Sequence, residues 1–166
     1  MGRYIILKAE IKDKIYVLIN IHAPNKDKDI VAFLTKLLIT LQNEDLDSEN
    51  NIVIGGDFNC PLNPTIDKKG GILIQRKSVT SCIDCLQSEL DLVDIWRIKN
   101  PDVNFTWSKK FPRIFCRLDY WLISNNLNDS VQLTDIIPAI RTDHDAIYLE
   151  FGESYTTSVE GQITGR

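Results

Sequence analysis

Residues 52–59 read Ile-Val-Ile-Gly-Gly-Asp-Phe-Asn, a short β-branched run followed by two glycines and then Asp57 and Asn59. A wholly apolar run bounded by glycines is typical of a central strand. Glycine lets the backbone approach a ligand closely. If the chain stays extended, alternation puts Asp57 and Asn59 on one face while Phe58 turns to the core. A carboxylate that deprotonates water, beside an amide that donates to an oxyanion, predicts hydrolytic chemistry here. The alternative is an Asx turn that closes the strand.

A second group of polar side chains follows another predicted strand. Residues 20–25 read Asn-Ile-His-Ala-Pro-Asn, and Pro24 ends the strand because it has no backbone N–H to donate. His22 and Asn25 therefore stand at the exit of that strand.

Two further stretches supply a carboxylate and an imidazole. Asp119 lies in the otherwise apolar run 118–123, and a charge buried in a strand is costly unless it is paired. His144 is one of two histidines in the chain and precedes the last predicted strand. An Asp119–His144 pair would fix the tautomer of the imidazole and favour its cationic form. Asp143 is then free to ligate a hard cation. The alternative for His144 is a loop histidine held by local capping.

The rest of the chain alternates predicted strands and helices. Residues 4–11 and 15–21 are rich in β-branched and aromatic residues and predict a β-hairpin. Apolar residues recur at helical spacing up to Leu41, which predicts an amphipathic helix capped by Asp27 or Asp29. A second helix is predicted over 78–96. Further strands are expected at 105–107, 118–123, 131–136 and 146–151. This alternation predicts an α/β domain.

Composition and charge exclude several function classes. The chain has 166 residues, enough for one domain, and its 43% hydrophobic and 25% charged residues are typical of globular proteins. No apolar run approaches the ~18 residues of a membrane span. We therefore expect no membrane partner and an intracellular location, nuclear or cytoplasmic. The net charge of −4 disfavours indiscriminate coating of nucleic acid.

Residues 104–117 depart from this acidic balance, because they carry four cations and four aromatic rings without an acid. Backbone phosphates would contact the cations and unstacked bases would contact the rings, so the stretch predicts nucleic-acid binding. The alternative is a solvated basic loop flanked by core aromatics.

Four motifs, in their order and spacing, resemble the exonuclease-endonuclease-phosphatase superfamily: NIHAPN at 20–25, GGDFN at 55–59, RLDYWLIS at 117–124 and TDHDAI at 142–147. Residues 89–97, with 100–101 and 105–108 after them, are similar to endonuclease domains of LINE-type non-LTR retrotransposons. The resemblance implies a deoxyribonuclease-like fold, an α/β sandwich of two sheets flanked by helices. It also implies that DNA is nicked by hydrolysis that depends on Mg²⁺, for which Mn²⁺ can substitute.

The same resemblance implies a role for each site residue. Asp57 would orient the attacking water with Asn59 as its partner, His144 would bind a phosphoryl oxygen with Asp119 orienting it, and Asp143 would help to hold Mg²⁺. The residues expected to contact DNA are His22 and Asn25 at the phosphate and Thr106, Trp107 and Arg117 along the groove. The family usually has Tyr at the position of His22, and an imidazole differs in reach and carries a titratable charge.

The resemblance leaves out the start of the family domain. The family's first strands carry an Asn and, after a Gln, a metal-binding Glu, and nothing before Asn20 matches them. We therefore expect residues 1–152 to be the C-terminal part of such a domain with its first strands missing. Residues 153–166 would be a tail or linker toward the reverse transcriptase of the same polyprotein. Weak Mg²⁺ binding and an exposed sheet edge or inner face should follow. We therefore expect the chain alone to be poorly active, poorly soluble, or both.

Two alternative functions stay open. One is another substrate within the superfamily, as in an abasic-site repair endonuclease or a phosphatase of small esters; the basic aromatic stretch favours nucleic acid over a small ester. The other is a catalytically inactive fragment that only binds nucleic acid or another chain. Separate substitutions of Asp57 and His144 distinguish these, because a binding module keeps its affinity whereas an enzyme loses turnover.

Overall fold

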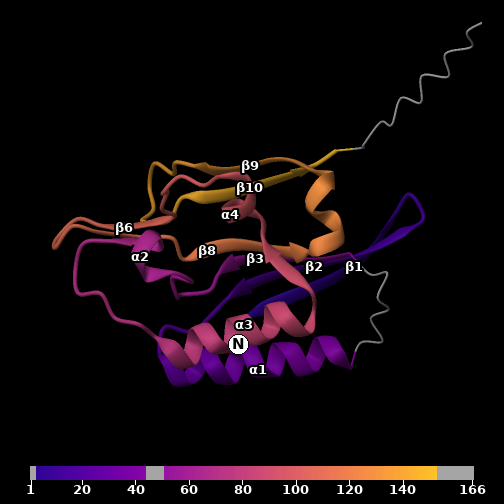
Figure 1. The fold of residues 1–166 in the computed structure, drawn as a ribbon, viewed down its shortest axis with the longest axis horizontal. Helices are drawn as coiled ribbons and strands as arrows, with labels where there is room; N and C mark the ends of the chain where they lie inside the picture. Colours follow the sequence, from indigo (N-terminus) through magenta and orange to yellow (C-terminus); the bar gives the residue numbers. More distant parts are fainter. Residues whose placement is uncertain (1–2, 44–50, 153–166) are drawn as a thin grey trace, which may run out of the picture.

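The central element is a five-stranded sheet with the order β1-β2-β3-β8-β5 (Figure 1). A computed structural model describes residues 3–43 and 51–152, so the predicted tail at 153–166 lies outside the described residues. The strands of this sheet are β1 (Tyr4–Ile11), β2 (Lys14–His22), β3 (Asn51–Asp57), β8 (Asp119–Ser124) and β5 (Leu92–Asp94). β2 and β3 are parallel, and the other neighbours are antiparallel.

The predicted hairpin is confirmed as β1 and β2. Tyr4 pairs with Ile21 at one end and Ile11 with Lys14 at the other. The turn residues Lys12 and Asp13 both have positive φ, at 51° and 61°, which suits the right-handed twist of a tight hairpin.

Helices α1 (Asp27–Gln42) and α3 (Lys77–Glu89) cover one face of this sheet (Figure 1). The buried positions of α1 follow the predicted apolar stripe, namely Ile30, Leu34, Leu37 and Leu41. The predicted cap was wrong, because the N-cap of α1 is Lys26 and makes no side-chain hydrogen bond. Asp27 instead accepts a hydrogen bond from Arg76, at 2.8 Å. Within residues 3–43 and 51–152, no helix is long and apolar enough to cross a membrane.

The predicted helix over 78–96 is three elements. α3 ends at Glu89, β5 follows, and α4 (Ile95–Lys99) begins after Asp94, which caps it. Asp91 has a φ of 47°, a left-handed conformation that interrupts a helix. Leu92 then pairs with Ser124 of β8. The helical spacing of the apolar residues predicted one continuous helix, because apolar residues can be buried from a strand as well as from a helix.

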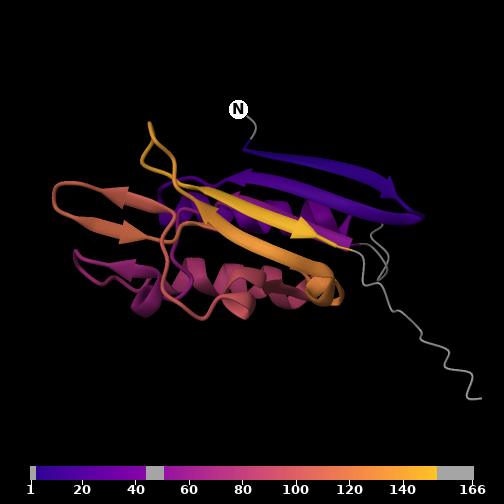
Figure 2. The ribbon, with the colours of Figure 1, turned by 90° about the horizontal axis from the view of Figure 1, so that it is seen from above.

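A second sheet packs on the other face of β8 (Figure 2). It consists of β9 (Val131–Ile137) and β10 (Ala146–Phe151), which are antiparallel, and the 3₁₀ helix η1 (Asn125–Ser130) leads into it. Val53 and Ile123 of the first sheet join Val131 in the core between the layers. The expected sandwich of two sheets flanked by helices is confirmed.

A small third sheet extends from one end of this sandwich and was not predicted. Its strands, in the order β4-β7-β6, are β4 (Lys68–Lys69), β7 (Ile114–Cys116) and β6 (Trp107–Lys109), and α2 (Pro64–Asp67) precedes it. The basic aromatic stretch 104–117 thus forms the β6–β7 hairpin, which projects from the molecule (Figure 1).

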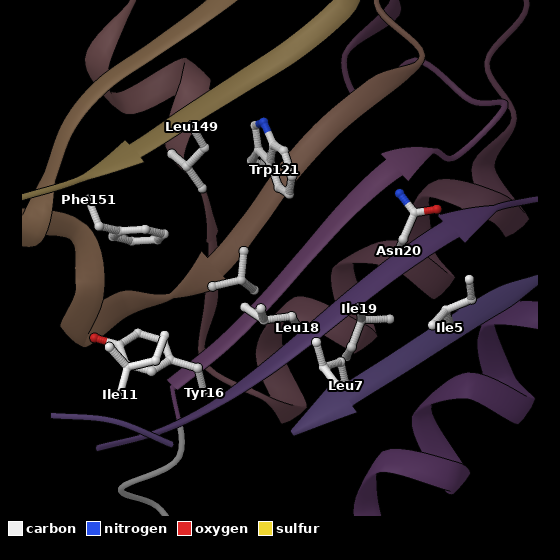
Figure 3. Close-up of a pocket in the computed structure, with 11 residues that line it drawn as sticks. Ile5, Leu7, Ile11, Tyr16, Leu18, Ile19, Asn20, Trp121, Leu149 and Phe151 are labelled. Atoms are coloured by element: carbon white, nitrogen blue, oxygen red, sulfur yellow. The ribbon is translucent and has the colours of Figure 1, made fainter. Parts of the chain in front are cut away.

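The second sheet leaves part of the first uncovered. An apolar groove of about 620 Å³ lies between β1, β2 and β10, with Leu149 and Phe151 on one side and Ile5 and Leu7 on the other (Figure 3). Ile5 is 71% exposed and Leu7 56% exposed. In the described part of the chain, β10 pairs with β9 and with no other strand. The predicted exposed inner face and open sheet edge are therefore both present.

Exposed apolar area beside open strand edges promotes association between copies. We expect the double substitution Ile5→Lys and Leu7→Lys to lower concentration-dependent association, measured by light scattering. Ile39→Lys is the matched control, because Ile39 is 52% exposed on α1, away from the groove. Equal association of the double variant and the control would show that the apolar groove is not the surface through which copies associate.

Candidate active site

The sheet register brings three predicted site residues into one row. His22 is the cross-strand partner of Asp57 between β2 and β3, and Asp57 is the partner of Asp119 between β3 and β8. Cross-strand partners have Cα atoms about 4.5–5.5 Å apart. His22 and Asp119 lie 35 and 62 positions from Asp57 in the sequence, and both are therefore its neighbours at one end of the sheet.

The side chains of Asp57 and Asn59 are hydrogen-bonded to each other. The backbone N–H of Asn59 donates to Asp57 Oδ1 at 2.8 Å, and Asn59 Nδ2 donates to Asp57 Oδ2 at 3.0 Å. Asn59 Nδ2 also donates to the carbonyl oxygen of Ala23 at 2.8 Å. An amide has two N–H donors, so both are used within the chain.

This geometry corrects two expectations for the Asp57 strand end. Asn59 has a φ of 51°, so the chain turns instead of staying extended. The Asx turn and the candidate site are the same structure, and Asn59 holds Asp57 rather than donating to an oxyanion. Phe58 turns to the core as predicted and is fully buried.

The two glycines serve strand packing instead of close approach to a ligand. A Cβ on Gly55 would lie 2.0 Å from the Trp121 ring, and a Cβ on Gly56 would lie 2.1 Å from the carbonyl oxygen of Ile21. Gly56 also has a φ of 130°, which other residues adopt only with strain.

The predicted Asp119–His144 pair is present. His144 Nδ1 lies 2.9 Å from Asp119 Oδ2, and the two side chains are 31% and 12% exposed. A carboxylate only accepts hydrogen bonds, so the proton of this bond sits on Nδ1 of the imidazole. The pair therefore fixes the ring and leaves Nε2 as its other polar atom.

The surroundings of Asp57 make it more basic than a free aspartate. Burial raises the pKa of Asp57, and the negative charge of Asp119 adds to that effect. The N–H of Asn59 and the two histidines oppose it without cancelling it. A carboxylate with a raised pKa accepts a proton from water more readily.

His22 and Asn25 lie at the open side of the site. His22 is largely exposed, and its Nε2 is 3.8 Å from Asp57 Oδ2. Asn25 is exposed, and its carbonyl oxygen accepts a hydrogen bond from Arg76 at 3.4 Å. Arg76 also donates to the carbonyl oxygen of Asn59, so it joins the two loops that carry these residues. Sequence reasoning missed Arg76, because its partners lie far away in the chain.

Asp143 is exposed but is not free, which corrects the expectation. Trp107 Nε1 donates to Asp143 Oδ2 at 2.8 Å, and the backbone N–H of Ser108 donates to the Asp143 carbonyl oxygen at 3.0 Å. The indole hydrogen bond lowers the pKa of Asp143. Trp107 also forms a β-bridge with His144, so the β6–β7 hairpin is tied to the loop that carries both residues.

Thr106 and Arg117 do not line a surface groove, which corrects that prediction. Thr106 is 0% exposed and Arg117 is 1% exposed. The Arg117 guanidinium donates to Asp67 Oδ1 at 2.8 Å and to Asp94 Oδ2 at 2.6 Å. Burial lowers the pKa of Arg117, but the bonds to the two carboxylates outweigh it and raise the pKa above its usual value. Neither side chain can reach a nucleic acid on the surface.

The described residues do not assemble a metal site of their own. Nowhere in residues 3–43 and 51–152 do three or more His, Cys, Asp or Glu side chains gather as metal ligands. Mg²⁺, however, is commonly held by one or two carboxylates together with substrate phosphates. Asp143 fits that limited role, since it is an exposed oxygen donor whose charged form is favoured.

Comparison with solved structures identifies the fold. The chain is similar to an AP endonuclease from Archaeoglobus fulgidus, with a TM-score of 0.69 and 20% identity over 88% of this chain. An AP endonuclease from Leishmania major matches 92% of the chain with a TM-score of 0.70 and 17% identity. A 3′-5′ exonuclease from Neisseria meningitidis matches 89% with a TM-score of 0.65 and 16% identity. The fold is that of AP endonucleases and the exonuclease-phosphatase proteins related to them.

In sequence, the chain is similar to a transposon protein. It is 30% identical over 151 residues to the transposon TX1 uncharacterized 149 kDa protein of Xenopus laevis, which covers 89% of this chain and 11% of that protein. The solved structures are likewise longer, since the chain matches 64%, 55% and 65% of their lengths. No protein-family description matches the chain. The similarity to a transposon protein agrees with the LINE-type resemblance.

The raised pKa of Asp57 is open to a direct test. We expect its carboxyl carbon, followed by NMR, to titrate above the ordinary value of 3.8. Asp119→Asn should lower that pKa, because it removes a neighbouring negative charge that favours the protonated form. Asp84→Asn, an exposed carboxylate on α3, is the control and should leave it unchanged. A carboxyl that titrates at or below 3.8 would refute the environment described for Asp57.

Proposed function

We propose that this chain nicks DNA by hydrolysing a phosphodiester bond, as the endonuclease part of a retrotransposon protein. The convergence of Asp57 with the Asp119–His144 pair carries the proposal. A basic carboxylate beside an oriented imidazole supplies a proton acceptor and a group that contacts phosphate.

In the proposed reaction, Asp57 orients a water and accepts its proton as the water oxygen bonds to phosphorus. The bond from phosphorus to the leaving oxygen breaks, and that oxygen takes a proton from solvent. His144, held through Nδ1 by Asp119, presents Nε2 to a phosphoryl oxygen, where an N–H donates a hydrogen bond and stabilises the added negative charge. Asn59 keeps the Asp57 carboxylate in place through two hydrogen bonds.

Mg²⁺ or Mn²⁺ is proposed as the cofactor, with Asp143 as the residue that would hold it. The ion would neutralise charge on the phosphate. Because the described residues offer few ligands, we expect the chain to bind the ion weakly in the absence of DNA.

The β6–β7 hairpin supports DNA as the substrate. Phe111 is 86% exposed and stands between Lys110 and Arg113, with Lys109 on the same hairpin. Cations contact phosphates, and an exposed ring stacks on bases or packs against the sugar edge. Trp107 links this hairpin to His144 and Asp143, so a strand bound along it would pass the candidate site.

A second candidate is endonuclease action at abasic sites. Its motivation is that the structural neighbours of the fold include two AP endonucleases. The similarity to the transposon TX1 protein favours the retrotransposon function. A reverse transcriptase segment of the same polyprotein is the partner that this function implies.

Nicking of supercoiled plasmid in the presence of Mg²⁺ tests the catalytic proposal. We expect Asp57→Asn and His144→Ala each to lower the rate about 100-fold or more, as is typical for loss of a general base or of a preorganised donor. Asp84→Asn should cleave at the parent rate. DNA affinity, measured by fluorescence anisotropy, should stay within a few-fold in both site variants.

Several outcomes separate the candidates. Cleavage confined to an oligonucleotide with an abasic site would favour the repair function. Binding without cleavage by the parent chain would favour a non-catalytic module. Nicking that survives Asp57→Asn would contradict the proposed mechanism.

The hairpin makes a separate prediction about binding. Phe111→Ala should weaken binding to single-stranded DNA about tenfold, since one stacked base contributes about 1–3 kcal/mol. Lys110→Glu should lower affinity and also reduce its dependence on salt, because one phosphate contact is lost. Lys36→Glu, an exposed change of the same charge on α1, is the control. Equal affinities in all variants would remove the hairpin from the interface.

A further inference from the structure

Thr106 is fully buried beneath the candidate site, and its hydroxyl is shared by two backbone amides. Thr106 Oγ1 accepts hydrogen bonds from the N–H of Leu118 at 2.9 Å and of Asp119 at 3.0 Å. A hydroxyl oxygen has two lone pairs, so both are engaged. The side chain therefore sets where the backbone of Asp119 lies as the chain enters β8.

The backbone of the same residue holds the loop that carries His144. The carbonyl oxygen of Thr106 accepts from the N–H of Asp145 at 2.7 Å. Its own N–H donates to the carbonyl oxygen of Cys116 at 3.0 Å, which anchors Thr106 to the start of the segment that leads to Asp119. Asp119 and His144 are 25 residues apart. Thr106 forms hydrogen bonds with the backbone of Asp119 on one side of their contact and with the backbone of Asp145 on the other.

Arg117 anchors the segment of the chain that leads into Asp119. Its guanidinium is held between Asp67 and Asp94, and its backbone N–H donates to the carbonyl oxygen of Asp67 at 2.8 Å. Asp119 is also the cross-strand partner of Asp57, so the Thr106 hydroxyl acts at the point where the anchored Arg117 leads into the paired strand β8.

We propose that Thr106 is a positioning residue, whose hydroxyl places the Asp119 carboxylate so that it orients the His144 ring through Nδ1. The inference rests on the proposed function for its catalytic consequence, but the geometry it claims exists without any reaction. Removing the hydroxyl leaves the partly buried N–H groups of Leu118 and Asp119 without this acceptor, and we expect the backbone at Asp119 to move to satisfy them.

Two substitutions isolate the hydroxyl. Thr106→Val keeps the volume of the side chain and removes the acceptor, whereas Thr106→Ser keeps the acceptor and loses a methyl group. The ring nitrogens of His144 are followed by ¹⁵N NMR, which distinguishes the Nδ1–H from the Nε2–H tautomer of the neutral imidazole. The chain has two histidines, so the spectrum of His22→Gln assigns the signals.

We expect the Nδ1–H form of His144 to dominate in the parent and in Thr106→Ser, and a mixture of tautomers in Thr106→Val. In the plasmid assay, kcat should fall tenfold or more in Thr106→Val with little change in KM, and Thr106→Ser should stay within twofold of the parent. If Thr106→Val does not fold, Thr106→Cys replaces it, because a thiol is a weak acceptor.

A folded Thr106→Val that keeps the Nδ1–H tautomer would overturn the proposal, as would a Thr106→Ser that loses it. A parent chain without nuclease activity would contradict the proposed function and leave the tautomer measurement as the test of positioning. The two proposals therefore fail by different observations.

Discussion

The register of β2, β3 and β8 is the constraint on which the site depends. It sets His22, Asp57 and Asp119 side by side, and a slip of one residue would turn each side chain to the opposite face. Burial on both faces holds this register. Ile52 and Ile54 of β3 pack in the core under α1 and α3, whereas Val53 packs toward the second sheet. The chemistry at the strand end is thus secured by apolar packing a few residues away.

The charges gathered at this end are stabilised by partners from distant segments. His144 faces Asp119, Asn59 holds Asp57, and Arg117 lies between Asp67 and Asp94. Removing one partner of a buried ion pair typically costs about 3–5 kcal/mol, so such contacts constrain the fold as well as the site. Asp57 is the carboxylate of this group whose pKa is raised, because burial and the charge of Asp119 disfavour its ionised form.

Arg117 and Thr106 show where inference from a sequence fails. Both belong to a stretch rich in cations and aromatic rings, which is a reasonable signature of nucleic-acid binding. The partners of Arg117 are 50 and 23 residues away, and Thr106 bonds to amides 12 and 13 residues further on. No local pattern distinguishes an arginine that meets phosphate from one that is neutralised inside the protein. The helix predicted beyond Glu89 was wrong for a related reason, since the spacing of apolar residues does not reveal the turn at Asp91.

The sequence by itself determined the hairpin, the amphipathic helix of residues 27–42, the buried strand before Asp57 and the pairing of Asp119 with His144. Each follows from residue periodicity, from the cost of an unpaired charge or from motif spacing, which are properties of nearby residues. Only the tertiary structure decided that Arg117 and Thr106 are internal, that Asn59 supports Asp57, and that β1, β2 and β10 enclose an apolar groove. Exposure and hydrogen-bond partners depend on segments far away in the chain, and they are settled when those segments pack.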